Sequence, residues 1–333
     1  MRILRRGVLL AVLAAAASMP AYAARESGYA SPRAAFETGL TSYRTGRYDD
    51  AIPALEFAIA HGDEQSRFFA MFYLARIYAD DNGQRADKAR AYELYKTLVL
   101  ENFDADPDDG RHAPFVAKAL IALSAYLRTG LPEIGLRPDL PRAVEWLNHA
   151  ANVLNDRDAQ FELAKLYLRG EGVAPDVKLA LHHLSVLSQG GHPGAQAFLA
   201  DLQWRGQYLP KDERRALALI TLAVEAAPAD ERLWIEDIYQ NIFCSASKNV
   251  RTEADAFVTL WKGMSMSASV AERPRPAPRA AASDHGAILP GPVELRPQRT
   301  CGDGVPINFQ ALRPGHDGER AQTARPVATP GAN

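Results

Sequence analysis

Residues 159–184, AQFELAKLYLRGEGVAPDVKLALHHL, decide the fold, because their pattern returns further along the chain. A shift of 36 residues aligns three parts of the stretch with a copy: Leu163-Ala164 with Leu199-Ala200, Arg169-Gly170 with Arg205-Gly206, and Asp176 with Asp212. In that alignment the adjacent histidines, His182 and His183, correspond to an alanine and a leucine of the copy. Self-similarity at a fixed period is the signature of repeat architectures. The stretch is therefore predicted to be mostly a scaffold unit.

One element of the pattern extends over most of the chain: an aspartate, three variable residues, an alanine and an apolar residue. It begins at Asp50, Asp87, Asp139, Asp176 and Asp212, with spacings of 37, 52, 37 and 36. Four residues beyond each alanine the apolar stripe continues, at Ala58, Tyr95, Leu147, Leu184 and Ile220. An aspartate carboxylate accepts the first free backbone N–H groups of a helix and suits its positive end. Each aspartate is therefore predicted to be the N-cap of an amphipathic helix.

A second helical stripe precedes each aspartate, ending near Tyr43, Tyr78, Tyr126, Tyr167 or Gln203. In the two most regular units Gly170 and Gly206 follow, where a helix needs a left-handed stop. Each helix pair has an apolar face that it cannot bury alone, so neighbouring pairs must stack. The predicted fold class is all-α: a right-handed α-solenoid of tetratricopeptide-like helix pairs over residues 35–270, including C-terminal capping helices.

The first 23 residues are predicted to be an export signal, cleaved after Ala23. They carry a basic head, an apolar run from Gly7 to Ala17 and a small-x-small cleavage site. The run is shorter than the ~20 apolar residues that a membrane-spanning helix needs. Arg5-Arg6 is compatible with twin-arginine export as well as with ordinary secretion. We expect a soluble exported product, at most peripheral to the membrane, with residues 24–34 as a linker.

The composition changes from Glu272 onward, where 10 of the 22 prolines lie in the last 62 residues. Residues 271–333 are predicted to be a Pro-rich, largely disordered tail. Two amphipathic segments before it, PADERLWIEDIYQNIFC and TEADAFVTLWKGM, are predicted to seal the end of the stack. In the second, Thr252 with Asp255 resembles a capping box. Four of its apolar residues are predicted to share one face: Phe257, Leu260, Trp261 and Met264.

The chain has only two cysteines, Cys244 and Cys301, and the second lies inside the predicted tail. This number excludes a multi-disulfide scaffold and a cysteine-rich zinc site. A disulfide between them in an oxidising compartment would tether the tail to the body. The alternative is a buried Cys244 and a Cys301 without a role, and the residues alone leave both interpretations open.

The spacing of 52 between Asp87 and Asp139 requires one unit plus an insertion. The predicted insertion is the segment from Glu101 to Pro114, ENFDADPDDGRHAP, which carries five carboxylates. Hard cations take several carboxylate ligands, but the spacing of an EF-hand is absent. A solvated acidic loop is therefore favoured over a calcium loop, and a role in contacting a partner fits either.

Catalytic and cofactor motifs are missing from the sequence. No Gly-x-Ser-x-Gly, His-Glu-x-x-His or Cys-His constellation occurs. Gly170-Glu-Gly172 lacks the lysine and the preceding strand of a phosphate loop. His182 and His183 point about 100° apart on a helix and cannot share a metal. We predict no enzyme, no cofactor and no metal site, and the formal charge of −2 gives no indication of nucleic acid.

The opening stretch resembles the Sel1-like repeat, a ~36-residue relative of the tetratricopeptide repeat. The Leu-Ala-x-Leu-Tyr, Gly-x-Gly-Val and Asp-x-x-x-Ala-Leu blocks carry this resemblance. From Ser31 to Cys244 the chain is also similar to the ExoR family of bacterial exopolysaccharide regulators. That similarity rests on an export signal followed by AFETGLTSYRTGRYDDAI, YLARIYAD, the insertion, PFVAKALIALSAYLRTGLP, two regular units and PADERLWIEDIYQ.

The second resemblance implies a periplasmic protein that binds the sensor domain of a membrane histidine kinase and holds it inactive. Proteolysis of such a protein would raise exopolysaccharide production and lower motility. The Pro-rich tail departs from the family pattern. The alternative function is a structural adaptor of an envelope or secretion complex, while a hydrolase would need the missing constellation.

A solenoid offers an extended surface for gripping a folded partner or a peptide. Exposed side chains that the repeat does not require are the candidate partner contacts. They are Arg205, Gln207 and Tyr208 in the last inter-helix turn, and Phe103 and Asp104 in the insertion.

Overall fold

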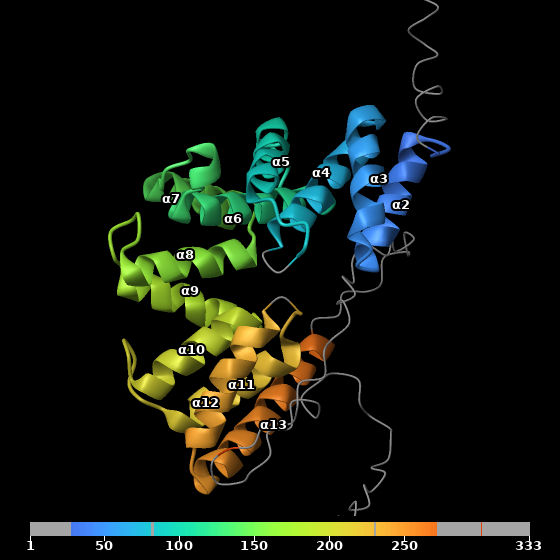
Figure 1. The fold of residues 1–333 in the computed structure, drawn as a ribbon. Helices are drawn as coiled ribbons and strands as arrows, with labels where there is room; N and C mark the ends of the chain where they lie inside the picture. The colour runs from blue at the N-terminus through green and yellow to red at the C-terminus, as the bar shows by residue number, and fades with distance from the viewer. Residues whose placement is uncertain (1–27, 81–82, 230, 272–300, 302–333) are drawn as a thin grey trace, which may run out of the picture. The chain divides into compact units, whose positions relative to one another are not determined.

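The structure is a computed structural model that describes residues 28–80, 83–229, 231–271 and 301, without the side chains of 264–271. These residues form a succession of helices (Figure 1) and no strand, with one isolated bridge between Leu131 and Leu136. The helices are α2 Pro32–Arg44, α3 Tyr48–His61, α4 Glu64–Ala79, α5 Lys88–Glu101, α6 Ala113–Thr129, α7 Leu140–Asn148, α8 Arg157–Arg169, α9 Val177–Gln189, α10 Pro193–Arg205, α11 Glu213–Ala226, α12 Arg232–Ser245 and α13 Lys248–Ala271.

The described chain divides within α9 into two compact units, residues 28–186 and residues 187–271 with Cys301. In the first unit each helix from α2 to α8 packs against the next, and α2 and α6 also contact α4 and α8, respectively. In the second unit α10 packs against α11 and α12, and α11 packs against α12 and α13. Contacts that stay between neighbours along the chain are typical of a solenoid. The predicted all-α fold of stacked helix pairs is confirmed.

The predicted apolar stripe forms the interior of both units. Its five positions are all buried, at Ala58, Tyr95, Leu147, Leu184 and Ile220. Burying a leucine or isoleucine side chain stabilises a fold by roughly 1.5–3 kcal/mol relative to exposure. Alanine at the start of each stripe allows the helices to approach closely, and these alanines are fully buried as well.

Four of the five repeat aspartates are N-caps, as predicted. An Oδ1 atom of Asp87, Asp139, Asp176 and Asp212 accepts the N–H three residues further on, at 3.0, 3.1, 2.9 and 3.0 Å. The backbone N–H of each aspartate donates to a carbonyl near the end of the preceding helix, at 2.7–3.2 Å. Each aspartate therefore fixes both the start of its own helix and the turn that leads into it.

The prediction that Asp50 is an N-cap is wrong. Helix α3 begins at Tyr48, and Arg47 takes the cap position without a side-chain hydrogen bond. The turn after α2 is short: the Arg47 N–H already donates to the Ser42 carbonyl at 2.9 Å, so the helix starts before Asp50 is reached. Asp50 lies in the first turn and pairs with Arg47 at 3.6 Å, where a negative charge still suits the helix end.

This difference between caps gives a testable prediction. Asp139→Ala is expected to lower the free energy of unfolding by about 1 kcal/mol, because the N–H of Arg142 loses its acceptor. Asp50→Ala is the matched control and should change stability by less than about 0.5 kcal/mol, because an exposed ion pair contributes little. Urea unfolding followed by circular dichroism measures both. Equal losses in the two variants would contradict the assignment of the caps.

The two closing segments form α12 and α13 as predicted, but two details of α13 differ. The helix begins at Lys248, so Thr252 lies inside it and donates to the Lys248 carbonyl at 3.1 Å instead of forming a capping box. Its buried side chains include Ala254 and Val258, whereas Leu260 is 67% exposed. The predicted face is therefore wrong at this position: close packing against α11 selects the smaller side chains of α13.

The predicted insertion is a loop between α5, which ends at Glu101, and α6, which begins at Ala113. The extra length is not confined to it, because α6 has 17 residues where α8 and α10 have 13. Asp106 accepts the N–H of Asp108 at 2.9 Å, and Asp109 pairs with His112 Nδ1 at 2.6 Å. The hydrogen bond from His112 holds the pKa of Asp109 below its ordinary value. Two of the five carboxylates thus shape the loop itself.

Some sequence-based predictions lie outside the described residues. They are the export signal at residues 1–23, the linker up to residue 27, the tail apart from Ala271 and Cys301, and the side chain of Met264. The described chain reaches helical structure at Pro32.

Candidate functional site

A groove lies between α2, α4 and α6 in the first unit and has a volume of about 530 Å³. Aromatic side chains from all three helices line it: Phe36, Phe69, Phe72, Tyr73 and Phe115. The Phe115 ring packs near three of the others, with centroids 5.0 Å from Phe69, 4.8 Å from Phe72 and 6.2 Å from Tyr73. We call this feature the aromatic groove. Its size is that of a site for a few side chains or a small ligand.

Five cations also line the aromatic groove: Arg33, Arg44, Arg76, Arg111 and Lys118. Two carboxylates also line it, and both are engaged: Glu37 pairs with Arg33 at 3.3 Å, and Asp63 accepts the N–H of Ser66 at 2.7 Å. Among the described residues, no carboxylate lies within 4.0 Å of the charged groups of the other four cations. The groove therefore combines an apolar lining with positive charges that lack ion-pair partners in the described chain.

Tyr73 lies where these two features meet. Burial raises the pKa of the Tyr73 hydroxyl above its ordinary value, and the positive charges of Arg44 and Arg76 oppose that rise. The two guanidinium groups are therefore close enough to act electrostatically on the Tyr73 hydroxyl. The phenol remains neutral at physiological pH and presents a hydroxyl at the apolar surface.

Our sequence analysis did not single out the aromatic groove. Aromatic residues at helical spacing usually indicate a buried face, and Phe68 and Phe72 are indeed only 3% exposed. The neighbouring residues Phe69 and Tyr73 remain half-buried because α2 covers α4 incompletely. The available signal was the paired aromatics of FFAMFY, which extend beyond the width of a single core stripe.

The predicted contact residues in the insertion are exposed, but Phe103 already packs against another residue of the chain. Its ring stacks on His149 with centroids 4.1 Å apart, and its carbonyl lies 3.2 Å from His149 Nε2. His149 begins a π-helical turn, His149–Val153, that follows α7. Phe103 is still 38% exposed, and Asp104 is exposed beside it. A partner-contact role for these two residues stays a prediction.

The other predicted contacts are exposed as well: Arg205 is the last residue of α10, and Gln207 and Tyr208 lie in the turn after it. They belong to the second unit, whereas Phe103 and Asp104 belong to the first, and none of the five lines the aromatic groove. Arg205 pairs with Asp201 at 2.9 Å within α10. A contact role stays a prediction for these residues as well.

Tyr208 has a strained backbone for its residue type. Its φ of 62° matches the 73° of Gly172, its counterpart one repeat earlier. A left-handed conformation suits glycine but costs other L-residues roughly 1–2 kcal/mol. Tyr208 is nevertheless 48% exposed, so burial of its ring does not fully offset this cost.

Tyr208→Gly is expected to raise the free energy of unfolding by roughly 0.5–1 kcal/mol, because glycine adopts this conformation without strain and loses some of the gain to its greater unfolded-state entropy. Thermal unfolding of the variant beside the parent protein measures the change. Gln207→Gly is the control in the same exposed turn, where the backbone has no positive φ and no gain is expected. A loss of stability in Tyr208→Gly would show that ring contacts outweigh the strain.

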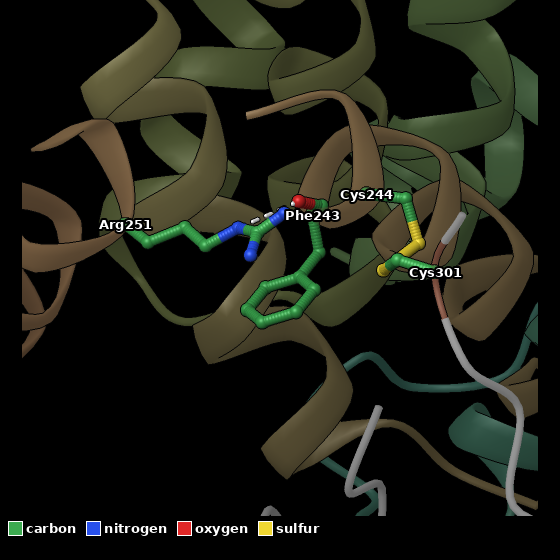
Figure 2. Close-up of a disulfide and its surroundings, with 4 residues drawn as sticks. All are labelled: Phe243, Cys244, Arg251 and Cys301. Carbon is green, nitrogen blue, oxygen red and sulfur yellow. Dashed lines mark hydrogen bonds between the residues drawn. A yellow bond between two sulfur atoms is a disulfide. The ribbon is translucent and has the colours of Figure 1, made fainter. Parts of the chain in front are cut away.

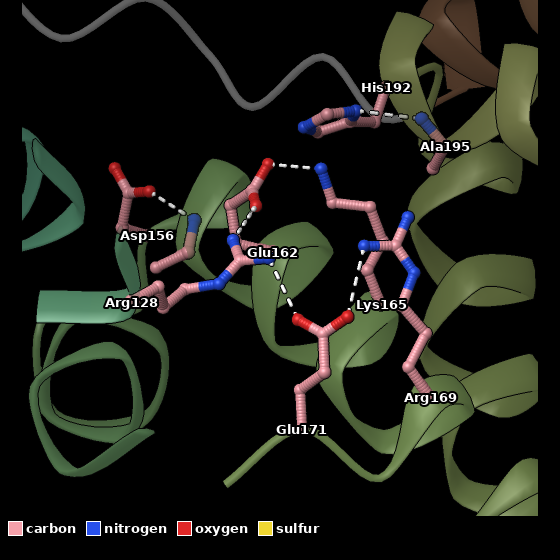
Figure 3. Close-up of polar contacts among 9 residues, drawn as sticks. Arg128, Asp156, Glu162, Lys165, Arg169, Glu171, His192 and Ala195 are labelled. Atoms are coloured by element: carbon pink, nitrogen blue, oxygen red, sulfur yellow. Dashed lines mark hydrogen bonds and ion pairs between the residues drawn. The ribbon is translucent and has the colours of Figure 1, made fainter. Parts of the chain in front are cut away.

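The Gly-x-Gly turn after α8, Gly170 to Gly172, takes part in a group of ion pairs that Figure 3 shows. Glu171, between the two glycines, pairs with Arg128 of α6 at 2.9 Å and with Arg169 at 3.4 Å. Arg128 also reaches Glu162 of α8 at 3.7 Å, and Glu162 pairs with Lys165. Both carboxylates thus lie between cations and join α6, α8 and the turn. This arrangement explains the motif as part of the scaffold.

The first helices of two successive pairs start in the same way, as Figure 3 also shows. Asp156 accepts the N–H of Ala159 at 2.8 Å, and the buried His192 accepts the N–H of Ala195 at 3.2 Å. Asp156 and His192 are one 36-residue repeat apart. His192 is therefore a cap in the described structure.

The comparison with known families matches this repeat geometry. The sequence profile of the Sel1 repeat matches residues 69–97, 117–152, 157–192 and 193–227. The matched segments begin within α4 and α6 and at α8 and α10, so each spans one helix pair.

The chain is similar over most of its length to proteins that are named for a role. The exopolysaccharide production negative regulator of Rhizobium meliloti (strain 1021) is 30% identical over 262 residues, which cover 76% of this chain and 92% of the relative. The chain belongs to the family of exopolysaccharide production negative regulators. The protein of the same name from Rhizobium leguminosarum bv. viciae is 29% identical over 231 residues, covering 69% of this chain and 81% of the relative.

A solved structure agrees on the fold of this family member. A Sel1 repeat protein from Oxalobacter formigenes has 21% sequence identity and a TM-score of 0.50, and the similarity covers 74% of this chain and 87% of that one. The Sel1 repeats and this structural similarity agree on a fold of stacked helix pairs.

The described part of this family member offers no metal site or membrane span. No group of three or more histidine, cysteine, aspartate or glutamate side chains in it is arranged to hold a metal ion. His182 and His183, with ring centroids 6.1 Å apart, do not form such a group. Of the helices described, none is long and apolar enough to cross a bilayer.

A disulfide joins Cys244 of α12 to Cys301 (Figure 2). Cys301 is only 5% exposed. Next to Cys244, the Phe243 carbonyl accepts a hydrogen bond from Arg251 Nε at 3.0 Å, and the guanidinium lies 4.5 Å from the Phe243 ring centroid. Of the two interpretations that the sequence left open, the structure has the one in which Cys244 and Cys301 form a disulfide. The covalent bond fixes one point of the C-terminal segment to the second unit.

Proposed function

We propose that the protein is exported to the periplasm, where it binds the sensor domain of a membrane histidine kinase and keeps that kinase inactive. In this role it limits exopolysaccharide production and sustains motility. The observation that carries the proposal is the 30% identity over 92% of a relative named as a negative regulator of exopolysaccharide production. The kinase partner and the periplasmic location come from the resemblance to the ExoR family that the sequence shows.

Three features of the chain support this proposal. The first 23 residues have the composition of an export signal. The disulfide suits an oxidising compartment, because cytosolic thiols are normally kept reduced. Sel1 repeats favour protein partners, since stacked helix pairs present an extended binding surface.

Restraint by binding sets a physical requirement. A binder shifts a two-state kinase only by its difference in affinity for the two states. Moving the equilibrium from mostly active to mostly inactive, from 1:99 to 99:1, takes about 5.5 kcal/mol of differential binding. An extended solenoid surface is suited to this, because it can contact several parts of one conformation of the sensor domain.

Deletion of the gene tests the proposal. We expect exopolysaccharide production to rise, motility to fall, and a plasmid copy of the gene to reverse both changes. The tagged protein should also co-purify with the periplasmic domain of the kinase and lose this association when that domain is deleted. Unchanged exopolysaccharide, combined with stable co-fractionation with cell-wall or secretion components, would contradict the regulator and favour a structural adaptor.

A further inference from the structure

The cations of the aromatic groove differ from other cations nearby in the first unit. Outside the groove, four cations of that region have carboxylate partners within 2.5–3.6 Å: Arg47, Arg67, Arg85 and Arg90. In the groove, Arg44, Arg76, Arg111 and Lys118 have no such partner among the described residues. Like charges that gather on one surface repel one another, so their arrangement costs stability unless a ligand compensates for it.

The apolar lining adds a second requirement for the ligand. Several rings of the groove stay accessible to solvent, and water at such a surface is displaced favourably by an apolar side chain. Large apolar side chains in pockets dominate binding energy at protein interfaces, while surrounding charges govern orientation and association rate. The combination fits a ligand that carries negative charges on either side of an aromatic or large aliphatic side chain.

We propose that the aromatic groove between α2, α4 and α6 binds an acidic segment of a partner protein, anchored by an aromatic or large aliphatic side chain. The inference deepens the proposed function and rests on it in one respect, that the protein acts by binding another protein. Arg44, Arg76, Arg111 and Lys118 attract the carboxylates of that segment. Phe69, Tyr73 and Phe115 receive its apolar side chain.

Other occupants fit the charge less well. The chain's own residues 272–333 contain eight arginines and six carboxylates, so this segment carries no net negative charge to neutralise the groove. A second copy of the groove in a two-fold symmetric contact would oppose cations to cations. An acidic oligosaccharide carries charge, but it lacks the apolar side chain for which the aromatic lining provides space.

Fluorescence anisotropy of the purified protein with a labelled peptide tests the inference. The probe is a short glutamate-rich peptide with a central phenylalanine, and its matched counterpart has lysine in place of every glutamate. We expect saturable binding of the acidic peptide, weakened by salt, and no binding of the basic one. Equal binding of both peptides, or tighter binding of an oligogalacturonate of matching charge, would overturn the proposal.

Charge reversal locates the binding. R76E/K118E is expected to lower the affinity for the acidic peptide at least about tenfold and to raise the affinity for the lysine peptide. Loss of folding cannot produce such a reversal. R137E/K178E is the matched control: it makes the same change of charge at exposed residues of the first unit outside the groove. Equal weakening by both double variants would show attraction to overall charge alone and would overturn the assignment.

A measurement in cells separates this inference from the proposed function. If deletion of the gene raises exopolysaccharide and R76E/K118E behaves like the deletion, with normal circular dichroism and normal protein level, both are supported. Full repression by R76E/K118E would overturn the groove as the partner site while the regulator role stands. An unaltered deletion strain would contradict the regulator role, and the peptide experiment would still decide what the groove binds.

Discussion

Gly172→Ala is expected to lower the free energy of unfolding of the first unit by about 3 kcal/mol. Gly172 has a φ of 73°, which costs alanine roughly 1–2 kcal/mol. A Cβ atom there would also lie only 2.6 Å from the Leu140 carbonyl oxygen and 2.8 Å from its carbon, both backbone atoms at the start of α7. Backbone cannot rotate away as a flexible side chain does, so the turn or α7 must move, at a further cost of about 1–3 kcal/mol.

Gly135→Ala is the matched control for this prediction. Gly135 has a φ of 69°, nearly the same as Gly172, but nothing lies within 4 Å of its Cβ position. Its substitution should therefore cost only the conformational part, roughly 1–2 kcal/mol. Urea unfolding of both variants separates the two contributions. Equal losses would mean that the contact between the turn after α8 and the start of α7 does not constrain the stack.

Loss of the disulfide is expected to lower the stability of the second unit by up to about 4 kcal/mol. The bond closes a loop with a sequence separation of 57 residues, and cross-linking a loop of that length removes much conformational freedom from the unfolded chain. Cys301→Ser removes the link while keeping the size of the side chain. Thermal unfolding followed by circular dichroism, with and without a reducing agent, measures the effect.

The two cysteines serve as controls for each other. Cys244→Ser and Cys301→Ser should give the same loss, because either removes the same bond. A reducing agent should destabilise the parent protein and leave both variants unchanged. A parent protein that is indifferent to reduction would contradict the stabilising role of the disulfide. A larger loss in Cys244→Ser would instead assign part of the effect to packing within α12.

The repeat and most of its caps were predictable from the sequence, because they depend on residues close together in the chain. An aspartate reaches an N–H three residues away, and a glycine adopts a left-handed turn, whatever the rest of the molecule does. Asp139 and Gly170 show this directly. Where the same logic failed, at Asp50 and Thr252, the helix begins earlier in the chain, at Tyr48 and Lys248, so both residues lie inside it.

The aromatic groove was not predictable in the same way. Phe36, Phe69 and Phe115 come from three helices far apart in sequence, and each alone fits an ordinary apolar stripe. Whether such a side chain is buried or remains accessible depends on how completely the next helix covers it. The unpaired state of Arg76 and Lys118 likewise depends on which carboxylates the fold brings near.

The sequence by itself determined the helices, their order and their pairing into repeats, because periodicity and capping act over a single turn of helix. It also determined the family, through residues spread over most of the chain. Only the tertiary structure decided which apolar residues stay open to a ligand, which cations lack partners, and that Cys244 lies beside Cys301. These properties depend on distances between segments remote in sequence, which packing sets and which no local pattern contains.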